Sequence, residues 1–174
     1  KTPDSSFIND VTIFTLQELN IEFDTREFES CGSDERNYNF PNVDLNIGSI
    51  MRSKYTEYLE YHTSKDDLNF IKPYCLEESL NIYKSCIETI ETNHIYTSNL
   101  KGEPFLSKFG LTSTLSGQSY KTLNNGVIVK KILYNINNKN SLIDICIKLK
   151  LEYKVILNII NTLETNNLIY KIIS

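Results

Sequence analysis

A chain of 174 residues, 40% of them hydrophobic and 11% aromatic, is long enough to bury a core, which excludes a disulfide-dependent miniprotein and a disordered chain. The net charge of −4 hides a division: residues 1–118 hold 10 Lys and Arg against 19 Asp and Glu, whereas residues 119–174 hold 8 against 3. No apolar run approaches the roughly 20 residues that cross a bilayer and no signal peptide opens the chain, so we expect no membrane partner.

The cysteines indicate free thiols. They lie far apart and form no Cys-x-x-Cys pair, which argues against a structural zinc knot. The four are Cys31, Cys75, Cys86 and Cys146. Because disulfides are rare in a reducing compartment, we expect a cytoplasmic protein. The chain opens on Lys1 instead of Met, so we also expect a piece of something longer.

The first predicted element is an amphipathic helix over residues 6–19, with Ser5 or Ser6 as its N-cap. Its apolar face consists of Phe7, Val11, Phe14 and Leu19. Aromatic residues then give residues 22–29 the character of a strand, and residues 43–51 alternate apolar and polar side chains with a period of two.

A polar loop follows each of these predicted strands, over residues 31–41 and 52–67. In an α/β sheet, loops beyond the carboxyl ends of neighbouring strands meet in the ligand crevice. Loops also carry much of the chemistry of proteins. We therefore expect a functional site where these two loops meet.

The next predicted helix begins near Pro73, whose missing N–H costs nothing in a first turn, and continues to about Ile90. Its apolar stripe consists of Leu76, Leu80, Tyr83 and Ile87. Residues 97–118 contain glycines, a proline and many hydroxyl groups, and this composition is typical of a linker.

The last third of the chain has the pattern of a winged helix-turn-helix. Three helices are predicted over residues 125–136, 141–150 and 153–166, followed by one strand over residues 168–173. Ser141 and Asp144 have the spacing of a capping box, with Asp in the usual position of Glu. Only one strand of the wing is evident.

Chemically unusual side chains gather in the two polar loops. His62 lies in the second loop, and a neutral imidazole is a natural zinc ligand. Asp34 lies in the first loop and could orient a ligand, bind a metal or move protons. The plainer alternatives are a solvated or structural His62 and an Asp-Glu-Arg cluster of surface ion pairs.

Three sequence runs in this part of the chain resemble the aminopeptidase-like zinc proteins related to the di-zinc aminopeptidases and glutaminyl cyclases. The runs are GSDERNY, GSIMRS and EYHTSKDDLNFI. They correspond to the C-terminal part of such a protein, and the resemblance extends over residues 6–174. It implies an α/β fold: the C-terminal portion of a three-layer α/β/α zinc-peptidase-like domain, followed by an α+β winged helix-turn-helix domain.

The resemblance also implies roles for individual residues. His62 matches a histidine that binds zinc in the family, and Asp34 matches a catalytic, ligand-orienting or proton-handling carboxylate. Glu35 stands where many relatives have His, as expected in a sub-branch with GSDER and a C-terminal winged helix. Tyr61 and Arg52 would line the substrate pocket, with a peptide-like or small-molecule substrate.

Two other charged side chains have competing interpretations. Arg52 could bind a substrate carboxylate, but a salt bridge to a nearby glutamate is the plainer alternative. The candidate partners are Glu35, Glu57 and Glu60. His94 follows a predicted helix, where the helix dipole favours it, and is interpreted as a helix-end residue and not as a metal ligand.

By the same resemblance, the remaining metal ligands lie upstream of this segment. A hydrolytic zinc site needs about three protein ligands and an open position for water. This chain offers one credible ligand, His62. We therefore expect zinc as the cofactor of a complete parent protein, and we expect this chain alone to be inactive.

The basic C-terminal part raises the question of nucleic acid. Its third helix offers four polar side chains to a groove: Lys154, Asn158, Asn161 and Thr162. However, no arginine follows Arg52, and arginine is the commonest reader of guanine. We therefore do not expect nucleic acid as a partner, and prefer a winged helix that packs on the catalytic domain or joins copies of a homo-oligomer.

These inferences combine into one prediction. Residues 1–96 form the C-terminal part of an aminopeptidase-like α/β domain, residues 97–118 a linker, and residues 119–174 the winged helix. The chain would supply one metal ligand and an accessory winged helix to a zinc-dependent hydrolase. The alternative is a non-enzymatic winged-helix module that binds DNA or a partner protein.

Overall fold

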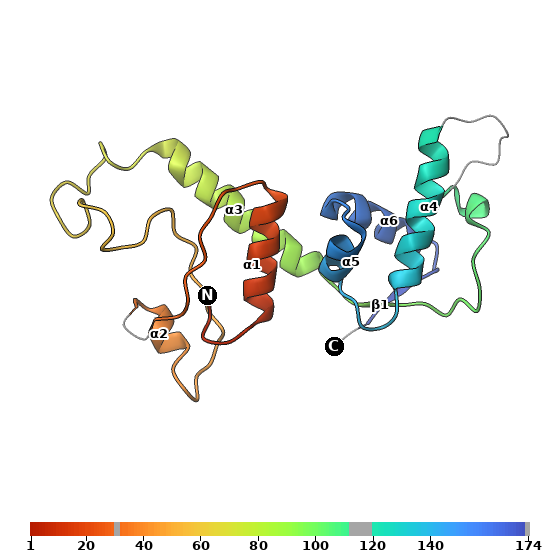
Figure 1. Cartoon of the computed structure of the whole chain (residues 1–174), viewed down its shortest axis with the longest axis horizontal. Coiled ribbons are helices and arrows are strands. Elements are labelled where there is room, and N and C mark those ends of the chain that lie inside the picture. The colour runs from red at the N-terminus through yellow and green to blue at the C-terminus, as the bar shows by residue number, and fades with distance from the viewer. Residues whose placement is uncertain (30–31, 112–119, 173–174) are drawn as a thin grey trace. The chain divides into compact units, whose positions relative to one another are not determined.

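The computed structural model describes residues 1–29, 32–111 and 120–172. The chain divides into two compact units, residues 1–90 (unit 1) and residues 91–174 (unit 2) (Figure 1). Within the described residues the structure is mainly helical, with one small sheet. None of the described helices has the length and apolar character that crossing a bilayer requires.

The expectation that the cysteines form no disulfide is confirmed at three of the four. These three are Cys75, Cys86 and Cys146. The fourth, Cys31, lies outside the described residues.

Helix α1 (Phe7–Glu18) opens unit 1 and confirms the first predicted helix. Its N-cap is Ser6, whose hydroxyl accepts a hydrogen bond from the N–H of Asn9 at 3.3 Å. The side chain of Asn9 donates to the Thr2 hydroxyl at 2.8 Å and accepts from the Thr2 N–H at 3.0 Å. The start of the helix is therefore tied to the first residues of the chain.

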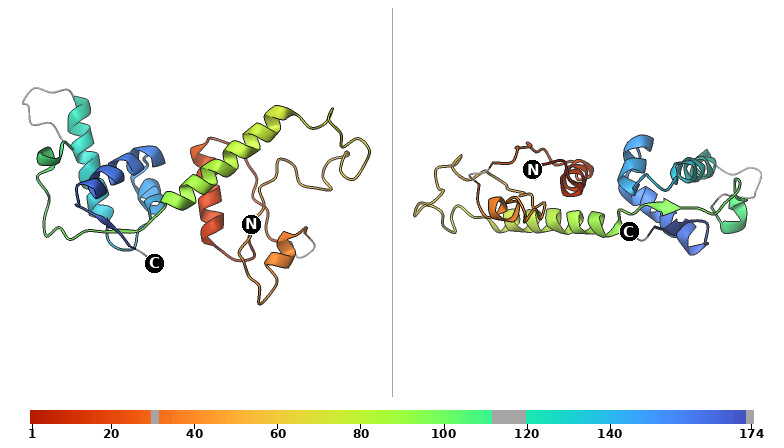
Figure 2. Two further views of the ribbon diagram at one scale, coloured as in Figure 1. Left: turned by 180° about the vertical axis from the view of Figure 1, so that it is seen from behind. Right: turned by 90° about the horizontal axis from the view of Figure 1, so that it is seen from below.

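Helix α3 (Pro73–Thr92) confirms the second predicted helix of unit 1 and lies beside α1 (Figure 2). The hydroxyl of Thr15 on α1 donates to that of Thr89 on α3 at 3.2 Å, and both side chains are buried. Burial raises the pKa of the nearby Cys86 thiol. The contact between the two helices therefore contains polar groups that are paired with one another.

The predicted apolar stripe of α3 is not part of that contact. Its four side chains are Leu76, Leu80, Tyr83 and Ile87, and they are between 47% and 62% exposed. The residues of α3 that are buried are Cys86 and Thr89. Helical spacing therefore predicted the stripe correctly, but the described residues of unit 1 leave about half or more of each of its side chains exposed.

The two strands predicted for unit 1 are wrong. Residues 22–29 and 43–51 are irregular, outside any helix or strand (Figure 1), and neither segment belongs to a sheet within the described residues. A strand exists only where a neighbouring strand supplies hydrogen-bond partners for its backbone. The aromatic content and the alternation of these segments describe side chains and supply no such neighbour.

A buried amide holds part of the second of these segments. The side chain of Asn39 is buried, donates to the carbonyl of Ile47 at 2.7 Å and accepts from the N–H of Ile47 at 2.9 Å. These are the two bonds that a neighbouring strand would make. Asn39 directly follows the short helix α2 (Glu35–Tyr38), which lies within the segment predicted as a loop.

The described part of unit 2 contains the three α-helices that the sequence predicted, α4 (Tyr120–Asn135), α5 (Leu142–Leu149) and α6 (Tyr153–Thr165). They enclose a continuous apolar core. Its fully buried members include Ile132, Leu142, Ile145, Ile156, Ile160, Leu163 and Ile169. Because this core draws on every helix of the unit and on the chain after α6, the three helices stabilise one another.

The start of α5 confirms the predicted capping box. The Ser141 hydroxyl accepts from the N–H of Asp144 at 3.3 Å, and the Asp144 carboxylate accepts from the N–H of Ser141 at 2.8 Å. Two backbone donors that have no partner inside the helix are satisfied in this way. The helix ends at Lys150, whose φ of 53° turns the chain towards α6.

A two-stranded antiparallel sheet completes the winged helix. Strand β2 (Tyr170–Lys171) lies within the predicted C-terminal strand, and it pairs with β1 (Tyr96–Thr97). The sequence showed no strand at β1, whose partner is more than 70 residues away. The 3₁₀ helix η1 (Leu106–Phe109) follows β1 within the segment predicted as a linker, and it buries Leu106.

Buried tyrosines connect the first residues of unit 2 to its core. The hydroxyl groups of Tyr153 and Thr92 lie 2.9 Å apart, within hydrogen-bond distance. Burial raises the pKa of Tyr153 to about 12. Burial, and then the charge of Glu164, raises the pKa of Tyr96 to about 12.

Candidate functional site

The first predicted site loop is organised by Glu35. Its carboxylate accepts a hydrogen bond from the N–H of Ser33 at 2.9 Å and from the Tyr55 hydroxyl at 3.3 Å. A Cβ atom at Gly32 would lie 2.2 Å from the same carboxylate oxygen, so the absence of a side chain at Gly32 lets the carboxylate reach its place. Sequence reasoning treated Glu35 only as a departure from the family pattern.

Asp34 does not take part in this arrangement. It precedes α2, its side chain makes no capping hydrogen bond, and it is exposed. Its backbone carbonyl accepts from the N–H of Asn37 at 2.9 Å. The carboxylate of Asp34 therefore faces solvent.

Tyr55 connects the first loop to the second. Its ring centroid lies 6.0 Å from that of Tyr61, and Tyr61 packs edge-on against Tyr58 at 5.8 Å. Burial, and then the charge of Glu35, raises the pKa of the Tyr55 hydroxyl. The spacing of tyrosines in the sequence was a signal for this cluster, but only the fold shows which rings touch.

His62 is held on the outer face of this cluster. Its ring stacks on Tyr61 with centroids 4.0 Å apart and an interplanar angle of 15°. Its φ is 57°, a conformation that His adopts more readily than most non-glycine residues. The next residue fixes the turn, because the Thr63 hydroxyl donates to the carbonyl of Glu60 at 2.8 Å. The exposed imidazole is thus oriented by stacking and by the backbone.

Arg52 pairs with a carboxylate that the sequence did not suggest. Its guanidinium lies 2.6 Å from the carboxylate of Glu78 on α3, whereas Glu35, Glu57 and Glu60 were the predicted candidates. The hydrogen bond to Glu78 raises the pKa of Arg52. A substrate carboxylate would have to compete with Glu78 for this guanidinium.

The structure therefore connects two of the residues that the sequence singled out for the site, Tyr61 and His62, and adds Glu35 and Tyr55 to them. Glu35 reaches Tyr61 and His62 through Tyr55, while Asp34 and Arg52 point elsewhere.

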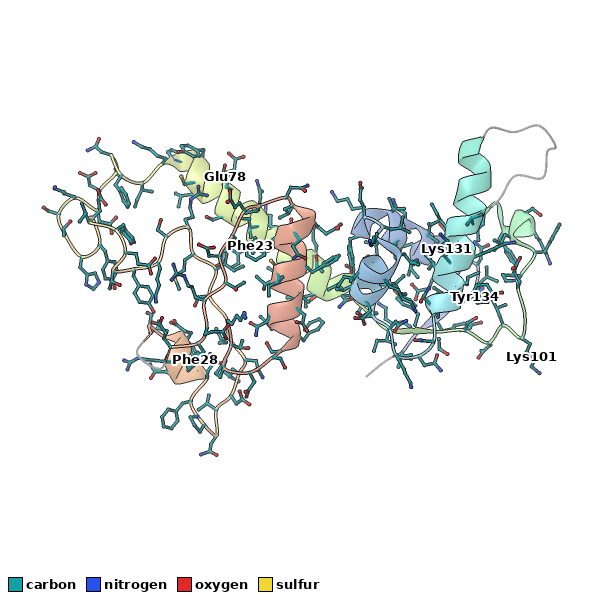
Figure 3. The ribbon with its side chains drawn as sticks, viewed as in Figure 1. Phe23, Phe28, Glu78, Lys101, Lys131 and Tyr134 are labelled. Atoms are coloured by element: carbon teal, nitrogen blue, oxygen red, sulfur yellow. The ribbon has the colours of Figure 1, made fainter. Side chains whose placement is uncertain are left out.

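A groove of about 1250 Å³ lies beside this cluster in unit 1. It is bounded by α1, α3 and residues 21–29 and 48–58, and Arg52, Tyr55 and Tyr58 are in its lining. Figure 3 labels three further lining residues: Phe23, Phe28 and Glu78.

Four ion pairs join residues that line the groove. Residues 26–29 take part in three of them and α3 in a fourth. The pairs are Lys1 with Glu27 (2.8 Å), Arg26 with Glu57 (3.2 Å), Lys54 with Glu29 (2.6 Å) and Arg52 with Glu78 (2.6 Å). Hydrogen bonds from their lysine partners lower the pKa of Glu27 and of Glu29. All four pairs are partly solvent-exposed, so they position the segments more than they stabilise them.

The described residues do not assemble a complete metal site. Among the described residues, no group of three or more His, Cys, Asp or Glu side chains is placed to hold a metal ion. His62 can donate one ring nitrogen, and a tetrahedral zinc site takes about three protein ligands. His94 packs edge-on against Tyr96 at 6.4 Å, within unit 2.

The third helix of unit 2 presents polar side chains, as predicted. Lys154, Asn158 and Asn161 on α6 are exposed. The Thr162 hydroxyl donates to the carbonyl of Asn158 at 2.9 Å, so its proton is used within the helix. On α4, the exposed Lys131 and Tyr134 lie on one face (Figure 3).

Comparisons with known proteins define the class to which each unit belongs. A family model described as winged helix-turn-helix matches residues 94–171, which confirms the predicted winged helix. A second model, described as “Domain of unknown function (DUF4910)”, matches residues 2–93. Because the second match covers more than half of the 174 residues, the chain belongs to the DUF4910 family.

A curated relative and a solved structure, both from Clostridium acetobutylicum, are similar to this chain. One is named “Putative polysaccharide biosynthesis protein with aminopeptidase-like domain”; it is 35% identical over 140 residues, which are 80% of this chain and 32% of the relative. The other is a crystal structure of a “putative peptidase”, with a TM-score of 0.81 and 30% identity over 97% of this chain and 36% of that one. The predicted likeness to aminopeptidase-like proteins is therefore confirmed, and the chain spans about a third of the length of these relatives.

Proposed function

We propose that this chain is the part of an aminopeptidase-like zinc hydrolase that supplies one metal ligand and an accessory winged helix, and that it has no activity alone. In this proposal unit 1 contributes the last elements of a three-layer α/β/α domain. The likeness to an aminopeptidase-like protein and to a peptidase structure supports the class of the parent protein. The length of those relatives, about three times that of this chain, supports the role of a part.

The orientation of His62 is the observation that carries the proposal. The exposed imidazole is fixed in one orientation by stacking on Tyr61 and by the left-handed backbone of its turn. Stacking occupies the face of the ring and leaves its edge, where the nitrogens lie, available to a metal. Zinc, when bound, would polarise a water molecule for hydrolysis.

The other predicted residues take supporting roles in the proposal. Asp34, exposed beside the first loop, would orient a ligand or handle a proton once the remaining ligands are present. Tyr61 would set the direction of the His62 ring. Arg52 would bind a substrate carboxylate in exchange for Glu78, with a peptide-like or small-molecule substrate. The remaining metal ligands would come from outside the described residues.

The test is zinc content in the longer protein that carries this segment, measured by elemental analysis. We expect His62→Ala to lower the zinc bound per chain by at least half, because removing one of about three ligands of a site weakens it strongly. The matched control is His94→Ala, which removes the other histidine and should leave zinc content unchanged. If His62→Ala retains the zinc content of the wild type, the assignment of the ligand is wrong.

A second candidate function is a winged-helix module that binds DNA or a partner protein. The favouring observation is the charge of unit 2, whose residues 91–174 hold 10 Lys against 5 Asp and Glu. Two contacts argue against DNA binding. Lys130 is already paired with Glu103 at 2.6 Å, and the Thr162 hydroxyl is hydrogen-bonded within α6. Phosphate contacts give an affinity that falls steeply with salt, so a salt titration tests the DNA version. If no binding is detected at low salt, the DNA-binding version of this function is wrong.

A further inference from the structure

The His62 ring lies at the border between a half-buried segment and an exposed one. Residues 62–74 are all exposed, whereas Tyr55, Tyr58 and Tyr61 just before them are half-buried. The direction of the His62 ring therefore depends on what holds these tyrosines.

Three successive contacts join Glu35 to the His62 ring. The Tyr55 hydroxyl donates to the Glu35 carboxylate at 3.3 Å. The Tyr55 and Tyr61 rings lie 6.0 Å apart and are tilted by 34°, and the Tyr61 and His62 rings stack at 4.0 Å. Aromatic rings with centroids about 4.5 to 7 Å apart prefer particular orientations, so a ring that is fixed at one end of this series restricts the others.

The Glu35 end of the series is fixed by the backbone. The oxygen that accepts from Tyr55 also accepts from the N–H of Ser33 at 2.9 Å. Gly32 leaves room for this oxygen, because a Cβ atom there would lie 2.2 Å from it. Burial, and then the charge of Glu35, raises the pKa of the Tyr55 hydroxyl, so Tyr55 keeps its proton at neutral pH and is the donor.

Ion pairs hold the same loop in a different way. Lys54 pairs with Glu29 at 2.6 Å, and Glu57 pairs with Arg26 at 3.2 Å. Ion pairs between partly exposed side chains hold a segment only weakly. They can fix the place of the loop backbone, whereas the bond to Tyr55 acts on an aromatic ring.

We propose that Glu35 is a positioning residue, which through Tyr55 and Tyr61 fixes the direction in which the ring nitrogens of His62 point. The inference rests on the proposed role of His62 as a metal ligand. Mutation of a residue that orients a metal ligand weakens metal affinity about 10- to 100-fold. Because Glu35 acts through two intermediate rings, we expect an effect of about tenfold.

The first test needs no metal and uses NMR of the whole chain with isotope-labelled histidine. The ring current of Tyr61 shields protons held over its face, so the His62 ring protons should resonate upfield of those of a free histidine. Glu35→Ala should remove at least half of that upfield shift. His94, which packs edge-on against Tyr96 in unit 2, is the internal reference and should not move.

Two further variants change the same hydrogen bond in opposite senses. Glu35→Gln keeps an oxygen that accepts from Ser33 and Tyr55, and it should retain the wild-type His62 resonances. Gly32→Ala keeps Glu35 but displaces its carboxylate, so its effect on His62 should match that of Glu35→Ala.

Glu57→Ala is the matched control, because it removes an ion pair from the same loop and leaves Glu35 in place. It should leave the His62 resonances unchanged. Retained exchange protection of residues 11–16, where α1 is buried, shows in every variant that unit 1 is folded.

The second readout is the Kd for zinc of the longer protein in which His62→Ala is tested. Glu35→Ala should raise this Kd about tenfold, and Glu35→Gln should restore it. A role in stability alone would change the exchange protection of unit 1 and would not be rescued in this way.

The proposal is overturned if Glu35→Ala leaves the His62 resonances in place, if Glu57→Ala moves them equally, or if Glu35→Gln does not retain them. It is also overturned if His62→Ala lowers zinc content while Glu35→Ala leaves the Kd unchanged. The metal assignment fails separately. If Glu35→Ala moves the His62 resonances but His62→Ala leaves zinc content unchanged, Glu35 does position the ring and only the ligand assignment is wrong.

Discussion

The clearest stability prediction compares the same substitution in the two units. Leu163 on α6 is 0% exposed, whereas Leu80 on α3 is 53% exposed. A buried Leu→Ala change removes contacts and leaves a cavity, at a cost of about 2 to 5 kcal/mol. An exposed one changes the free energy of unfolding by about 0.5 kcal/mol or less. Leu163→Ala should therefore destabilise the protein strongly and Leu80→Ala hardly at all.

The magnitude can be expressed as a urea midpoint. For a unit of this size the denaturant slope is about 1 to 1.5 kcal/mol per molar urea, near the lower end of the usual range. A loss of about 3 kcal/mol then lowers the midpoint by about 2 to 3 M, and a loss of 0.5 kcal/mol lowers it by less than about 0.5 M. Exchange protection in increasing urea is the assay, followed in residues 142–169 of unit 2 for Leu163→Ala and in residues 11–16 of unit 1, where Val11, Phe14 and Leu16 are buried, for Leu80→Ala.

Two results would refute the reasoning. The first is a shift below about 0.5 M for Leu163→Ala, since it would mean that α6 is not packed on a core. The second is an equal shift for Leu80→Ala, since it would mean that the stripe of α3 is covered within this chain. If Leu163→Ala is unfolded without urea, Ile160→Val, a smaller change at a fully buried site, should lower stability by about 0.5 to 1.5 kcal/mol.

The remaining predictions concern hydrogen bonds of unit 2. Ser141→Ala removes half of the capping box and should lower the free energy of unfolding by about 1 kcal/mol, which is about 4 to 8 °C in Tm by calorimetry. Ser53→Ala, at an exposed loop position, is the control and should not lower Tm. An equal drop in Tm for both variants would argue against the cap. Burial raises the pKa of Tyr153 to about 12. Tyr153 therefore holds its proton more tightly in the folded protein than in the unfolded chain, and the free energy of unfolding should fall as pH rises from 10 towards 12. Tyr153→Phe should lose the bond to Thr92 at every pH but show a smaller drop in urea midpoint between pH 9 and 11 than the wild type; an equal drop contradicts the assignment.

The sequence predicted an element correctly where the residues that stabilise it lie close together along the chain. The capping residues Ser6 and Ser141, and the apolar spacing of α5 and α6, were readable from the sequence because they act within one turn or one helix. The same holds for the start of α3 at Pro73. Residue types that are several positions apart on a helix report its face, and this information does not depend on the rest of the chain.

Local sequence patterns could not predict which strands pair or which side chains meet at the site. The pairing of Tyr96 with Lys171 joins residues at opposite ends of unit 2, and nothing local at Tyr96 indicates it. Conversely, residues 22–29 have the composition of a strand but pair with no strand among the described residues, and a strand depends on its partner and not only on its own composition. The partner of Arg52, Glu78 on α3, was missed for the same reason.

By itself, the sequence determined the longer helices α1, α3, α4, α5 and α6, the caps, the winged-helix pattern and the likeness to aminopeptidase-like proteins, since each rests on residue types at short spacings. Only the tertiary structure decided that Glu35 reaches His62 through Tyr55 and Tyr61, that the stripe of α3 is exposed, and that unit 2 holds the core while unit 1 holds an apolar groove. Burial and contact are properties of surfaces that meet across long sequence separations. A pattern along the chain shows which side chains are apolar, and only the folded chain shows what covers them.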